Sequence, residues 1–407
     1  MDYSNKTKPE LVALCKERGI KGYSTQKKEG LVALLLAAAP TPSADVITHV
    51  VPPAAAAPVV HRLNYIGSKF QLLEWMTGIM REKTGWAGFN GKRVADIFAG
   101  TGIVSHHFRL GGSPVLSNDA ELYSSIITHA FTRSVYSANC EAMIKVLKDD
   151  VVANKHAACA GFITKNYSPH NGCERKFFTV ENARRIDYIR GRIEELKPTM
   201  DCDEYKFMVA SLLLSADAVS NVPAVYGCFL HNYKSKALKT LMLDPIHDNR
   251  LAAAVGSTTF HSDVLDDAFL GGIHADMVYL DPPYNGRQYS KNYFPLNMIA
   301  MTPSAVASTE LHGKTGIPNT CFMSPFCKKG KVVEDAFEKL FRDLDTTWIF
   351  LSYNSESTVP KDTMLALMRK YGEASVVERD YKRFKSFEYN QDVEIKEYLF
   401  CLRKTRA

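Results

Sequence analysis

Four consecutive residues, Asp281, Pro282, Pro283 and Tyr284, follow directly on the apolar run 277–280 and combine an acid, two prolines and an aromatic ring. Proline holds a rigid turn and carries no backbone N–H to compete for an acceptor. The Asp281 carboxylate and the Pro282 carbonyl oxygen can therefore accept hydrogen bonds from one amino group, while the Tyr284 ring stacks on a base. This combination suits chemistry on an aromatic amine, whose nitrogen lone pair becomes reactive only when its hydrogens are drawn out of the ring plane.

A glycine turn lies upstream, in the stretch "DIFAGTGIVSHHF" from Asp96 to Phe108. Gly100 and Gly102 permit a tight strand-to-helix turn that a ligand can approach closely. The spacing does not complete the G-x-G-x-x-G pattern of dinucleotide sites, so a purely structural turn is the alternative. The same alternative applies to the 281–284 segment, which could be only a turn after a buried strand.

Two further acids close apolar stretches and favour a nucleoside ligand. Asp119 ends "LSND", about twenty residues after the glycine turn, where an acid can accept hydrogen bonds from two ribose hydroxyls. Asp263 closes "FHSD" and could accept from an adenine amino group or cap a helix. A nucleoside cofactor would then meet a second ligand at Asp281. The negative charge of Asp281 favours the positively charged sulfonium group of S-adenosylmethionine. Positioning of the two ligands and electrostatic stabilisation would then account for most of the rate of reaction.

The elements that must position these residues alternate between strands and helices from His61 onward. Apolar strands separated by helix-length segments predict an α/β fold with a doubly wound, mostly parallel sheet, whose ligands bind beyond the carboxyl ends of the strands. The final stretch, "EIKEYLFCLRK", predicts an antiparallel edge strand. Residues 120–255 are too long for one crossover and predict a helical insertion within the domain 61–407. The predicted strands are "RVADIFAG", "PVLSND", "STTFHSD", "DMVYLDPP" and "TTWIFLSYNS".

The amino-terminal residues form a module of their own. Residues 1–36 predict two short amphipathic helices, with Thr7 and Glu10 placed for a capping box. The helix, "GIKG" bend and lysine-rich second helix resemble a SAP-type DNA-binding module. The alternative is a helical hairpin that docks on its own main domain or on another protein. Residues 37–60 are rich in Ala and Pro and predict a linker.

Composition narrows the class of protein. A net charge of +6 is compatible with a polyanionic partner. Basic stretches with interleaved aromatics, "ERKFF", "NARRIDYIRGR", "CKKGK" and "YKRFK", favour phosphate contacts. Nine scattered cysteines without metal-like spacing argue against a disulfide framework and a metal site. No apolar run approaches the roughly 20 residues of a membrane span, so we expect a soluble, intracellular protein.

Taken in order, "RLNYIGSKFQLLEWM", "DIFAGTG", "SND" and "YLDPPYNGRQYSKNYF" resemble the successive motifs of the Dam-like, alpha-type adenine-N6 DNA methyltransferases. Further segments, among them "SADAVSNVPAVYGCFL" and "SPFCKKGK", resemble a branch of modification enzymes. The resemblance covers residues 61–403. It implies methyl transfer from S-adenosyl-L-methionine to the exocyclic amino group of an adenine flipped out of double-stranded DNA.

The resemblance also implies residue roles. Ser352 and Asn354 would help to shape the target pocket, and Ile97 stands where the family commonly has Pro. The implied cofactor residues are Tyr65, Gly67, Ser68 and Lys69 at the methionine end, Asp96, Phe98, Gly100 and Gly102 in the glycine loop, Asp119 at the ribose and Asp263 at the adenine ring; the implied catalytic residues are Asp281, Pro282, Pro283 and Tyr284.

Three alternatives remain open at this point. An RNA adenine methyltransferase would use the same four catalytic residues. Cytosine-N4 methylation is disfavoured because the motif begins with Asp rather than Ser. A DNA-binding protein could retain the fold without catalysis. The sequence gives no indication of oligomeric state.

Overall fold

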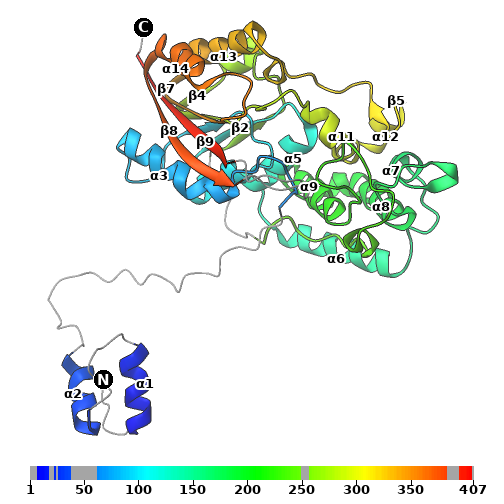
Figure 1. The fold of residues 1–407 in the computed structure, drawn as a ribbon. Coiled ribbons are helices and arrows are strands. Elements are labelled where there is room, and N and C mark those ends of the chain that lie inside the picture. Colours follow the sequence, from blue (N-terminus) through cyan, green and yellow to red (C-terminus); the bar gives the residue numbers. More distant parts are fainter. Residues whose placement is uncertain are drawn as a thin grey trace. The chain divides into compact units, whose positions relative to one another are not determined.

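The computed structural model describes residues 7–17, 23, 26–37, 62–248, 256–382 and 394–405 (Figure 1). The chain forms two compact units, Met1–Ala57 and Pro58–Ala407. This boundary falls within the predicted linker, which beyond Ala37 lies outside the described residues. None of the helices in the described ranges is both long and apolar enough to cross a membrane.

The first unit contains the two expected helices, α1 (Lys8–Glu17) and α2 (Lys28–Ala37). Leu11, Cys15 and Leu31 form its small buried core. At the start of α1 the backbone N–H and the hydroxyl of Thr7 both donate to Glu10 Oε2, each at 2.7 Å. The acid thus bonds back to the backbone N–H that precedes the helix, which is one half of the predicted capping box.

The second unit is built on a sheet with the strand order β3-β2-β1-β4-β7-β9-β8. Strands β3, β2, β1, β4 and β7 run parallel, and β9 pairs antiparallel with both β7 and β8. The predicted doubly wound α/β fold is confirmed. The strands are β1 (Val94–Asp96), β2 (Val115–Asn118), β3 (Thr258–Phe260), β4 (His274–Leu280), β7 (Asp345–Asn354), β8 (Gly372–Lys382) and β9 (Glu394–Lys404).

The final strand does not lie at the sheet edge, so that prediction is wrong. β8 takes the edge, and β9 lies between β7 and β8. The reason is burial on both faces of β9: Leu399 and Cys401 pack on one side, Phe400 and Leu402 on the other. A strand that is apolar on both faces is favoured inside a sheet rather than at its rim.

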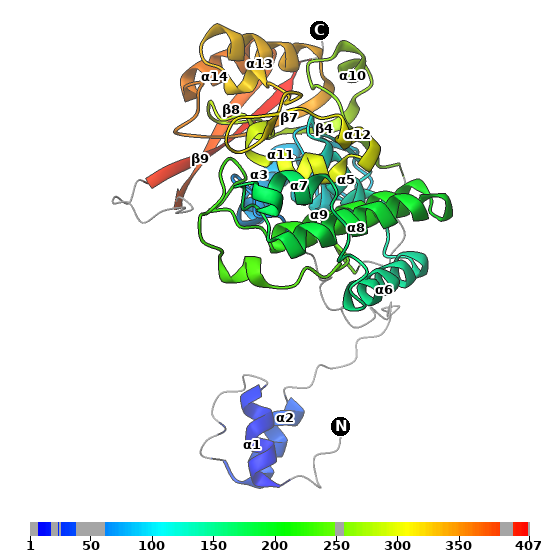
Figure 2. The same ribbon diagram turned by 90° about the vertical axis from the view of Figure 1, so that its right-hand side faces the viewer.

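Helices cover both faces of the sheet. α3 (Leu73–Thr84) and α4 (Ile103–Leu110) pack on one face, and α10 (Asp267–Gly271), α13 (Lys331–Asp343) and α14 (Lys361–Arg369) pack on the other. α13 and α14 lie side by side in both ribbon views (Figures 1 and 2). This leaves the carboxyl ends of the parallel strands as the edge where ligands bind.

The long connection between β2 and β3 is helical, as predicted for residues 120–255. Its helices share one core with α11 and α12, so the insertion packs as part of the main unit (Figure 2). These elements are α5 (Leu122–Thr132), α6 (Ala138–Val152), α7 (Phe162–Tyr167), α8 (Val180–Leu196), α9 (Cys202–Ala218), α11 (Tyr289–Ala300) and α12 (Pro303–Ala307). The remaining short elements are the hairpin strands β5 (Leu311–His312) and β6 (Ile317–Pro318) and the 3-10 turns η1 (Phe70–Leu72), η2 (His170–Gly172), η3 (Lys197–Thr199), η4 (Ser235–Leu238) and η5 (Pro325–Cys327).

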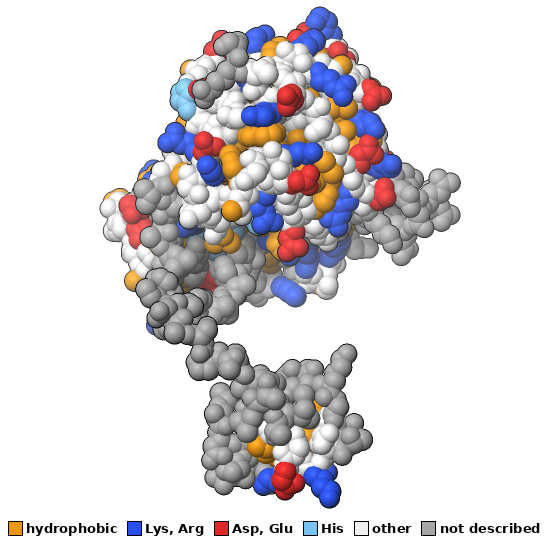
Figure 3. Space-filling model, turned by 90° about the vertical axis from the view of Figure 1, so that its left-hand side faces the viewer, with side chains coloured by type: hydrophobic (Ala, Val, Ile, Leu, Met, Phe, Trp, Pro, Cys, Tyr) orange, Lys and Arg blue, Asp and Glu red, His pale blue; other side chains and the backbone are white. Residues whose placement is uncertain are grey.

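Positive charge is not segregated on the face shown in Figure 3. Lys and Arg side chains lie there among Asp and Glu side chains, with apolar side chains between them. Several arginines of α8 are also engaged within the protein. Arg190 is buried and donates to Ile299 O at 3.1 Å and to Glu194 Oε2 at 3.0 Å. The stretch "NARRIDYIRGR" therefore supplies fewer phosphate contacts than its charge suggests, and most of "YKRFK" lies outside the described residues.

Candidate active site

Three acids meet at the carboxyl edge of the sheet. Asp96 is the last residue of β1, and Asp119 and Asp281 come directly after β2 and β4, which flank β1. Burial raises the pKa of Asp96 to about 7, and the charges of Asp281 and Asp119 act in the same direction. The sheet order thus brings together three carboxyl groups that the sequence separates by up to 185 residues (281 minus 96).

The glycine turn is shaped by close packing. Gly100 and Gly102 have φ values of 53° and 72°, a left-handed conformation that disfavours a side chain. A Cβ at Gly100 would lie 3.3 Å from the Tyr65 ring. A Cβ at Gly102 would lie 2.9 Å from Thr128 Oγ1 and 3.0 Å from the Phe131 ring. Gly102 therefore allows α4 to approach α5, and Gly100 keeps space in front of Tyr65.

Asp119 holds this turn through both of its oxygens. Oδ2 accepts from the backbone N–H of Gly100 at 2.8 Å, and Oδ1 accepts from that of Glu121 at 2.9 Å. Ser124 Oγ donates to Gly100 O at 2.6 Å. Burial raises the pKa of Asp119 in spite of these two donors. Each oxygen keeps a lone pair for a ligand hydroxyl.

Asp96 provides a test of which ligand fits this edge. Its Oδ2 accepts from Ser105 Oγ at 2.6 Å, whereas Oδ1 is buried and has no hydrogen-bond partner among the described residues. An unpaired buried acceptor is costly, and here it adjoins two other carboxyl groups. A cationic ligand with N–H donors would satisfy it. The residues therefore fit the ammonium and sulfonium groups of S-adenosylmethionine.

Asp281 lies between a cation and a phenol. Lys69 Nζ is 2.9 Å from Asp281 Oδ1, and Tyr284 OH donates to the same oxygen at 2.9 Å. Lys69 also donates to Gly67 O at 2.8 Å and lies 4.7 Å from the centre of the Tyr284 ring. The Asp281 side chain keeps 19% of its surface exposed, and its Oδ2 accepts no hydrogen bond from the described residues. Burial raises the pKa of Asp281, while Lys69 and Tyr284 oppose that shift.

The segment that carries Lys69 reaches the site by packing on α11. The Tyr65 ring stacks on Tyr293 at 4.6 Å between centroids and lies 5.4 Å from Tyr289. The backbone N–H of Ile66 donates to Tyr293 OH at 3.0 Å. Because α11 begins five residues after Tyr284, these contacts fix residues 65–69 beside the turn at 281–284.

Comparison with known proteins agrees with this arrangement. The model of D12 class N6 adenine-specific DNA methyltransferases matches residues 65–367, about three quarters of the chain. The chain belongs to this class. It is an adenine-specific DNA methyltransferase, and membership of the class implies DNA as substrate and S-adenosyl-L-methionine as methyl donor. The matched residues include every acid of the carboxyl edge described above.

Individual relatives support the same assignment. The methyltransferase is 37% identical over 341 residues to the type II methyltransferase M.CviAII of Paramecium bursaria Chlorella virus 1, which covers 84% of this chain and 98% of that protein. It is 36% identical over 349 residues to M.NlaIII of Neisseria lactamica, covering 84% and 100%. It is 31% identical over 361 residues to M.FokI of Planomicrobium okeanokoites, covering 85% of this chain and 53% of that protein.

Three of the cofactor residues proposed from the sequence are not part of the cluster formed by Asp96, Asp119 and Asp281. Asp263 is exposed after β3, and its Oδ1 accepts from the backbone N–H of Leu265 at 3.0 Å. Ser68 is half-buried, and Phe98 packs edge-to-face on Phe326 at 5.1 Å. Neither of these two contacts involves Asp96, Asp119 or Asp281. They neither add to nor remove from the three-acid cluster.

The two residues expected to shape the target pocket serve the interior of the methyltransferase. Ser352 is buried and accepts from Tyr279 OH at 2.9 Å, with Met76 Sδ 3.6 Å away. Asn354 Oδ1 accepts from Ser357 Oγ at 2.9 Å and from the backbone N–H of Glu356 at 3.0 Å. Ser352 therefore supports the floor under the site, and Asn354 shapes the turn after β7.

Two buried acids were missed by the sequence interpretation. Glu121 accepts from Asn297 Nδ2 at 2.6 Å and from Ser290 Oγ, and burial raises its pKa to about 7. It joins the Asp119 turn to α11. Glu397 is 7% exposed on β9. The signal for Glu397 was available: an acid within the alternating apolar strand "EIKEYLFCL".

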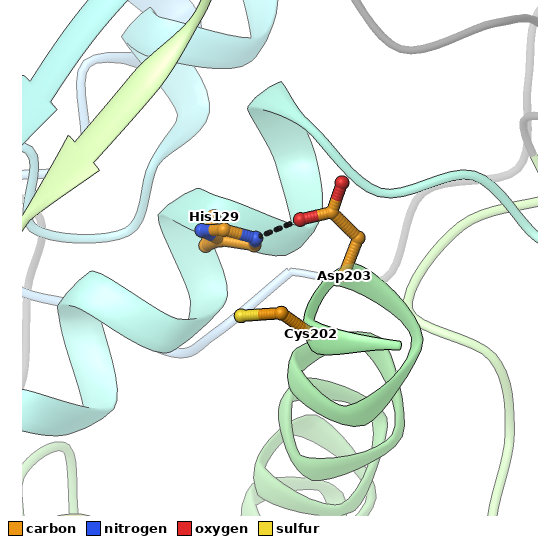
Figure 4. A group of neighbouring side chains, drawn as sticks. All are labelled: His129, Cys202 and Asp203. Carbon is orange, nitrogen blue, oxygen red and sulfur yellow. Dashed lines mark hydrogen bonds and ion pairs between the residues drawn. The ribbon is translucent and has the colours of Figure 1, made fainter. Parts of the chain in front are cut away.

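One cluster with metal-ligand residue types lies away from this site, between α5 and the start of α9. His129 Nε2 is 2.7 Å from Asp203 Oδ1, with the Cys202 thiol below them (Figure 4). Lys206 Nζ lies 3.2 Å from the other His129 nitrogen, and Arg133 Nε lies 3.3 Å from Asp203. Burial, aided by Lys206, lowers the pKa of His129 to about 4. Lys206 and Arg133 already contact the ligand atoms of His129 and Asp203, so these two residues join the helices rather than holding a metal ion.

Proposed function

We propose that this methyltransferase acts on an adenine flipped out of double-stranded DNA, with Asp281, Pro282, Pro283 and Tyr284 as its catalytic residues. The observation that carries the proposal is the partly exposed Asp281 carboxylate, which has one oxygen free of hydrogen bonds to the described residues and lies beside two further acids of the sheet edge. A base still stacked in a duplex could not reach such a recessed group, so extrusion is required.

The cofactor would occupy the carboxyl edge of the sheet. When bound, it supplies an electrophilic methyl group on a sulfonium sulfur. Asp119 would accept from the ribose hydroxyls, and Asp96 Oδ1 would accept from the ammonium group. Tyr65 over Gly100 would confine the methionine end together with the turn at Gly67. The remaining proposed contacts are Ser68, Lys69, Phe98, Gly102 and, at the adenine ring, Asp263.

The chain's own contribution to the reaction is positioning. Asp281 Oδ2 and the Pro282 carbonyl oxygen would accept the two amino hydrogens of adenine, drawing them out of plane and exposing the nitrogen lone pair. Lys69 stabilises the ionised form of Asp281, which is the form that can accept. Tyr284 packs edge-to-face on Tyr353 at 5.2 Å, which fixes the ring on which the base would stack. Proton loss from the amine follows transfer readily, so no strong base is needed.

A role in restriction and modification is part of this proposal. The three relatives described above carry the name type II methyltransferase, and another relative is named modification methylase LlaI, from Lactococcus lactis subsp. lactis. Methylation would then protect particular sequences in the host DNA from a partner endonuclease.

The test is transfer of a radiolabelled methyl group from S-adenosyl-L-methionine to unmethylated duplex DNA, single-stranded RNA and an adenine-free duplex. We expect label on the adenine-containing duplex only, resistant to RNase and recovered as N6-methyladenine after digestion to nucleosides. Label on RNA, or recovery as N4-methylcytosine, would contradict the proposal. Binding of cofactor and DNA without any transfer would favour the inactive alternative.

The amino-terminal unit would add DNA affinity without choosing the sequence. Removing residues 1–60 should raise the Kd for DNA and make log Kd less dependent on log salt, by about 0.9 for each phosphate that the unit neutralises. The pattern of methylated sites should stay the same. The control is a full-length chain in which residues 38–57 are replaced by a Gly/Ser linker of equal length. An unchanged salt slope after the deletion would assign the unit to the helical-hairpin alternative.

A further inference from the structure

Gln288 is a buried amide that bonds to a segment distant in sequence. It comes directly before α11, in the stretch that follows Tyr284. Its Nε2 donates to the backbone oxygen of Ser324 at 3.1 Å, and its Oε1 accepts from the backbone N–H of Ser324 at 2.8 Å. Both polar atoms of one side chain are thus paired with the backbone of one residue, which fixes that backbone in position.

Two further contacts hold the same segment against the residues that follow the turn at 281–284. Cys327 Sγ donates to the backbone oxygen of Arg287 at 3.3 Å. A Cβ at Gly286 would lie 3.6 Å from the backbone oxygen of Cys327. The short turn η5 therefore touches residues 286–288 at both of its ends, through Ser324 at one and Cys327 at the other.

The inner side of η5 is anchored in an aromatic cluster. Phe326 packs edge-to-face on Phe98 at 5.1 Å and on Phe337 of α13 at 5.1 Å. Phe337 packs in turn on Tyr353 at 5.7 Å, and Tyr353 packs on Tyr284 at 5.2 Å. The segment is thus fixed both to the protein interior and to the residues around Tyr284.

Three cations extend into solvent from this contact. Arg287 belongs to one of the two joined segments, and Lys328 and Lys329 directly follow the other. All three are exposed, and the structure shows no ion pair for any of them among the residues it describes. Lys331, by contrast, pairs with Asp335 at 2.6 Å.

The surrounding chain supplies no acid to neutralise these cations. Residues 282–309 and 319–333 contain neither Asp nor Glu. Positive groups that are held together without internal partners attract an anionic ligand. The ligand already expected beside Asp281 is a nucleotide of DNA, and its phosphates stay outside when its base enters a recessed site.

We propose that Gln288 is a positioning residue for DNA: by holding Ser324 it presents Lys328 and Lys329, together with Arg287, to the backbone phosphates on either side of the flipped adenine. The proposal rests on the proposed function, because those phosphates reach this surface only if the base enters the site at Asp281. Phosphate contacts set affinity and register rather than sequence choice. Cations that are fixed before DNA arrives bind it without an ordering cost.

The first experiment removes the two lysines. The probe is a short unmethylated duplex containing a sequence that the parent methylates, with S-adenosyl-L-homocysteine present so that no methyl group can be transferred. For the full-length chain with Lys328→Gln and Lys329→Gln, the slope of log Kd against log salt should fall by about 1.8, since each phosphate contact contributes about 0.9. Over a fourfold rise in salt, the parent should lose about twelvefold more affinity than the variant.

The matched control removes two positive charges from the opposite edge of the sheet. Lys92 and Arg93 directly precede β1, so they lie at the amino ends of the parallel strands. Lys92→Gln with Arg93→Gln should leave the salt slope at the value of the parent. A lysine variant whose slope matches that of the parent, or a control that loses as much slope as the lysine variant, would overturn the proposal.

The second experiment tests Gln288 without changing any charge. Gln288→Met keeps the length of the side chain but pairs with neither atom of Ser324, so the slope should fall by ~1 or more. Added to the two lysine changes, it should cause little further loss, because the three residues act through one contact. The control is Ser324→Ala, which leaves both bonds of Gln288 in place because they join the Ser324 backbone.

The slope separates positioning from a merely structural role. A destabilised fold would reduce the fraction of enzyme that binds cofactor and leave the salt slope of that fraction unchanged, and this result for Gln288→Met would overturn the proposal. Gln288→Asn keeps an interior amide that is shorter by one methylene and reaches at most one of the two Ser324 atoms. Its slope should lie between those of the parent and Gln288→Met; a slope equal to that of the parent would count against the proposal.

The position of the phosphates has a test of its own. Neutral methylphosphonates in place of the phosphates on either side of the target adenine should weaken binding by the parent and leave the affinity of the lysine variant unchanged. Equal losses in both proteins would place the lysines on other phosphates and contradict the proposal. Failure of the parent to form N6-methyladenine would contradict the proposed function instead, so the two failures are distinct.

Discussion

Replacing Asp281 with alanine should abolish methyl transfer, lowering kcat by about 10³-fold or more, the loss measured when a preorganised hydrogen-bonding group is removed from a reacting centre. The variant has no carboxylate to draw the amino hydrogens out of plane, and the Pro282 carbonyl alone cannot hold both. Affinity for DNA and for the cofactor should remain measurable, because neither affinity depends mainly on the Asp281 carboxylate. The measurements are single-turnover transfer of labelled methyl and equilibrium binding of each ligand.

A control lies at the other end of the same strand. Asp276 is exposed and accepts from the backbone N–H of Arg93 at 2.8 Å, so Asp276→Ala removes an acid from β4 without touching the site. It should cost about 1 kcal/mol of stability and leave kcat near that of the parent. Turnover of Asp281→Ala at a rate close to the parent would remove Asp281 from the mechanism.

Replacing Asp119 with alanine should raise the KM for S-adenosyl-L-methionine by about 100-fold, the effect of losing two hydrogen bonds to a charged acceptor. The substitution also leaves the backbone N–H groups of Gly100 and Glu121 without their acceptor, so the glycine turn loses its support. The effect should fall on KM far more than on kcat, because the ribose, to which we propose that Asp119 binds, is a part of the cofactor that does not react. Steady-state kinetics at varied cofactor concentration separates the two constants.

The control for this variant is Asp267→Ala. That carboxylate is 89% exposed at the start of α10 and pairs with Lys339, so its loss should leave both constants unchanged. An Asp119→Ala enzyme that kept the KM of the parent while losing kcat would assign Asp119 to catalysis rather than to cofactor binding.

The turns and strand ends of the site could be predicted from the sequence because each depends on a short stretch of neighbouring residues. Gly100 and Gly102 indicate a left-handed turn whatever the surrounding fold. The apolar residues that precede Asp281 indicate a buried strand by their composition. Asp119 follows the same pattern. Since parallel strands present their carboxyl ends at one edge, the convergence of these residues follows once a doubly wound sheet is expected.

The features that local signals do not fix depend on neighbours that are distant in sequence. The strand at 394–404 was expected at the edge of the sheet, but its pairing with both β7 and β8 depends on the apolar surfaces that those strands offer. Ser352 was expected at the target pocket, yet its partners are Tyr279 and Met76 beneath the site. Lys69 was expected at the methionine end of the cofactor, and the structure adds an ion pair with Asp281, 212 residues away (281 minus 69).

The sequence by itself determined the chemistry available to this enzyme: an acid with two prolines and a tyrosine after a buried strand, a glycine turn and a second acid after another strand. These depend on backbone preferences and short-range periodicity, which act between near neighbours. Only the tertiary structure decided that Lys69 forms an ion pair with Asp281. Strand order and register are set by burial and pairing across the whole sheet, and they alone determine which charges share a face.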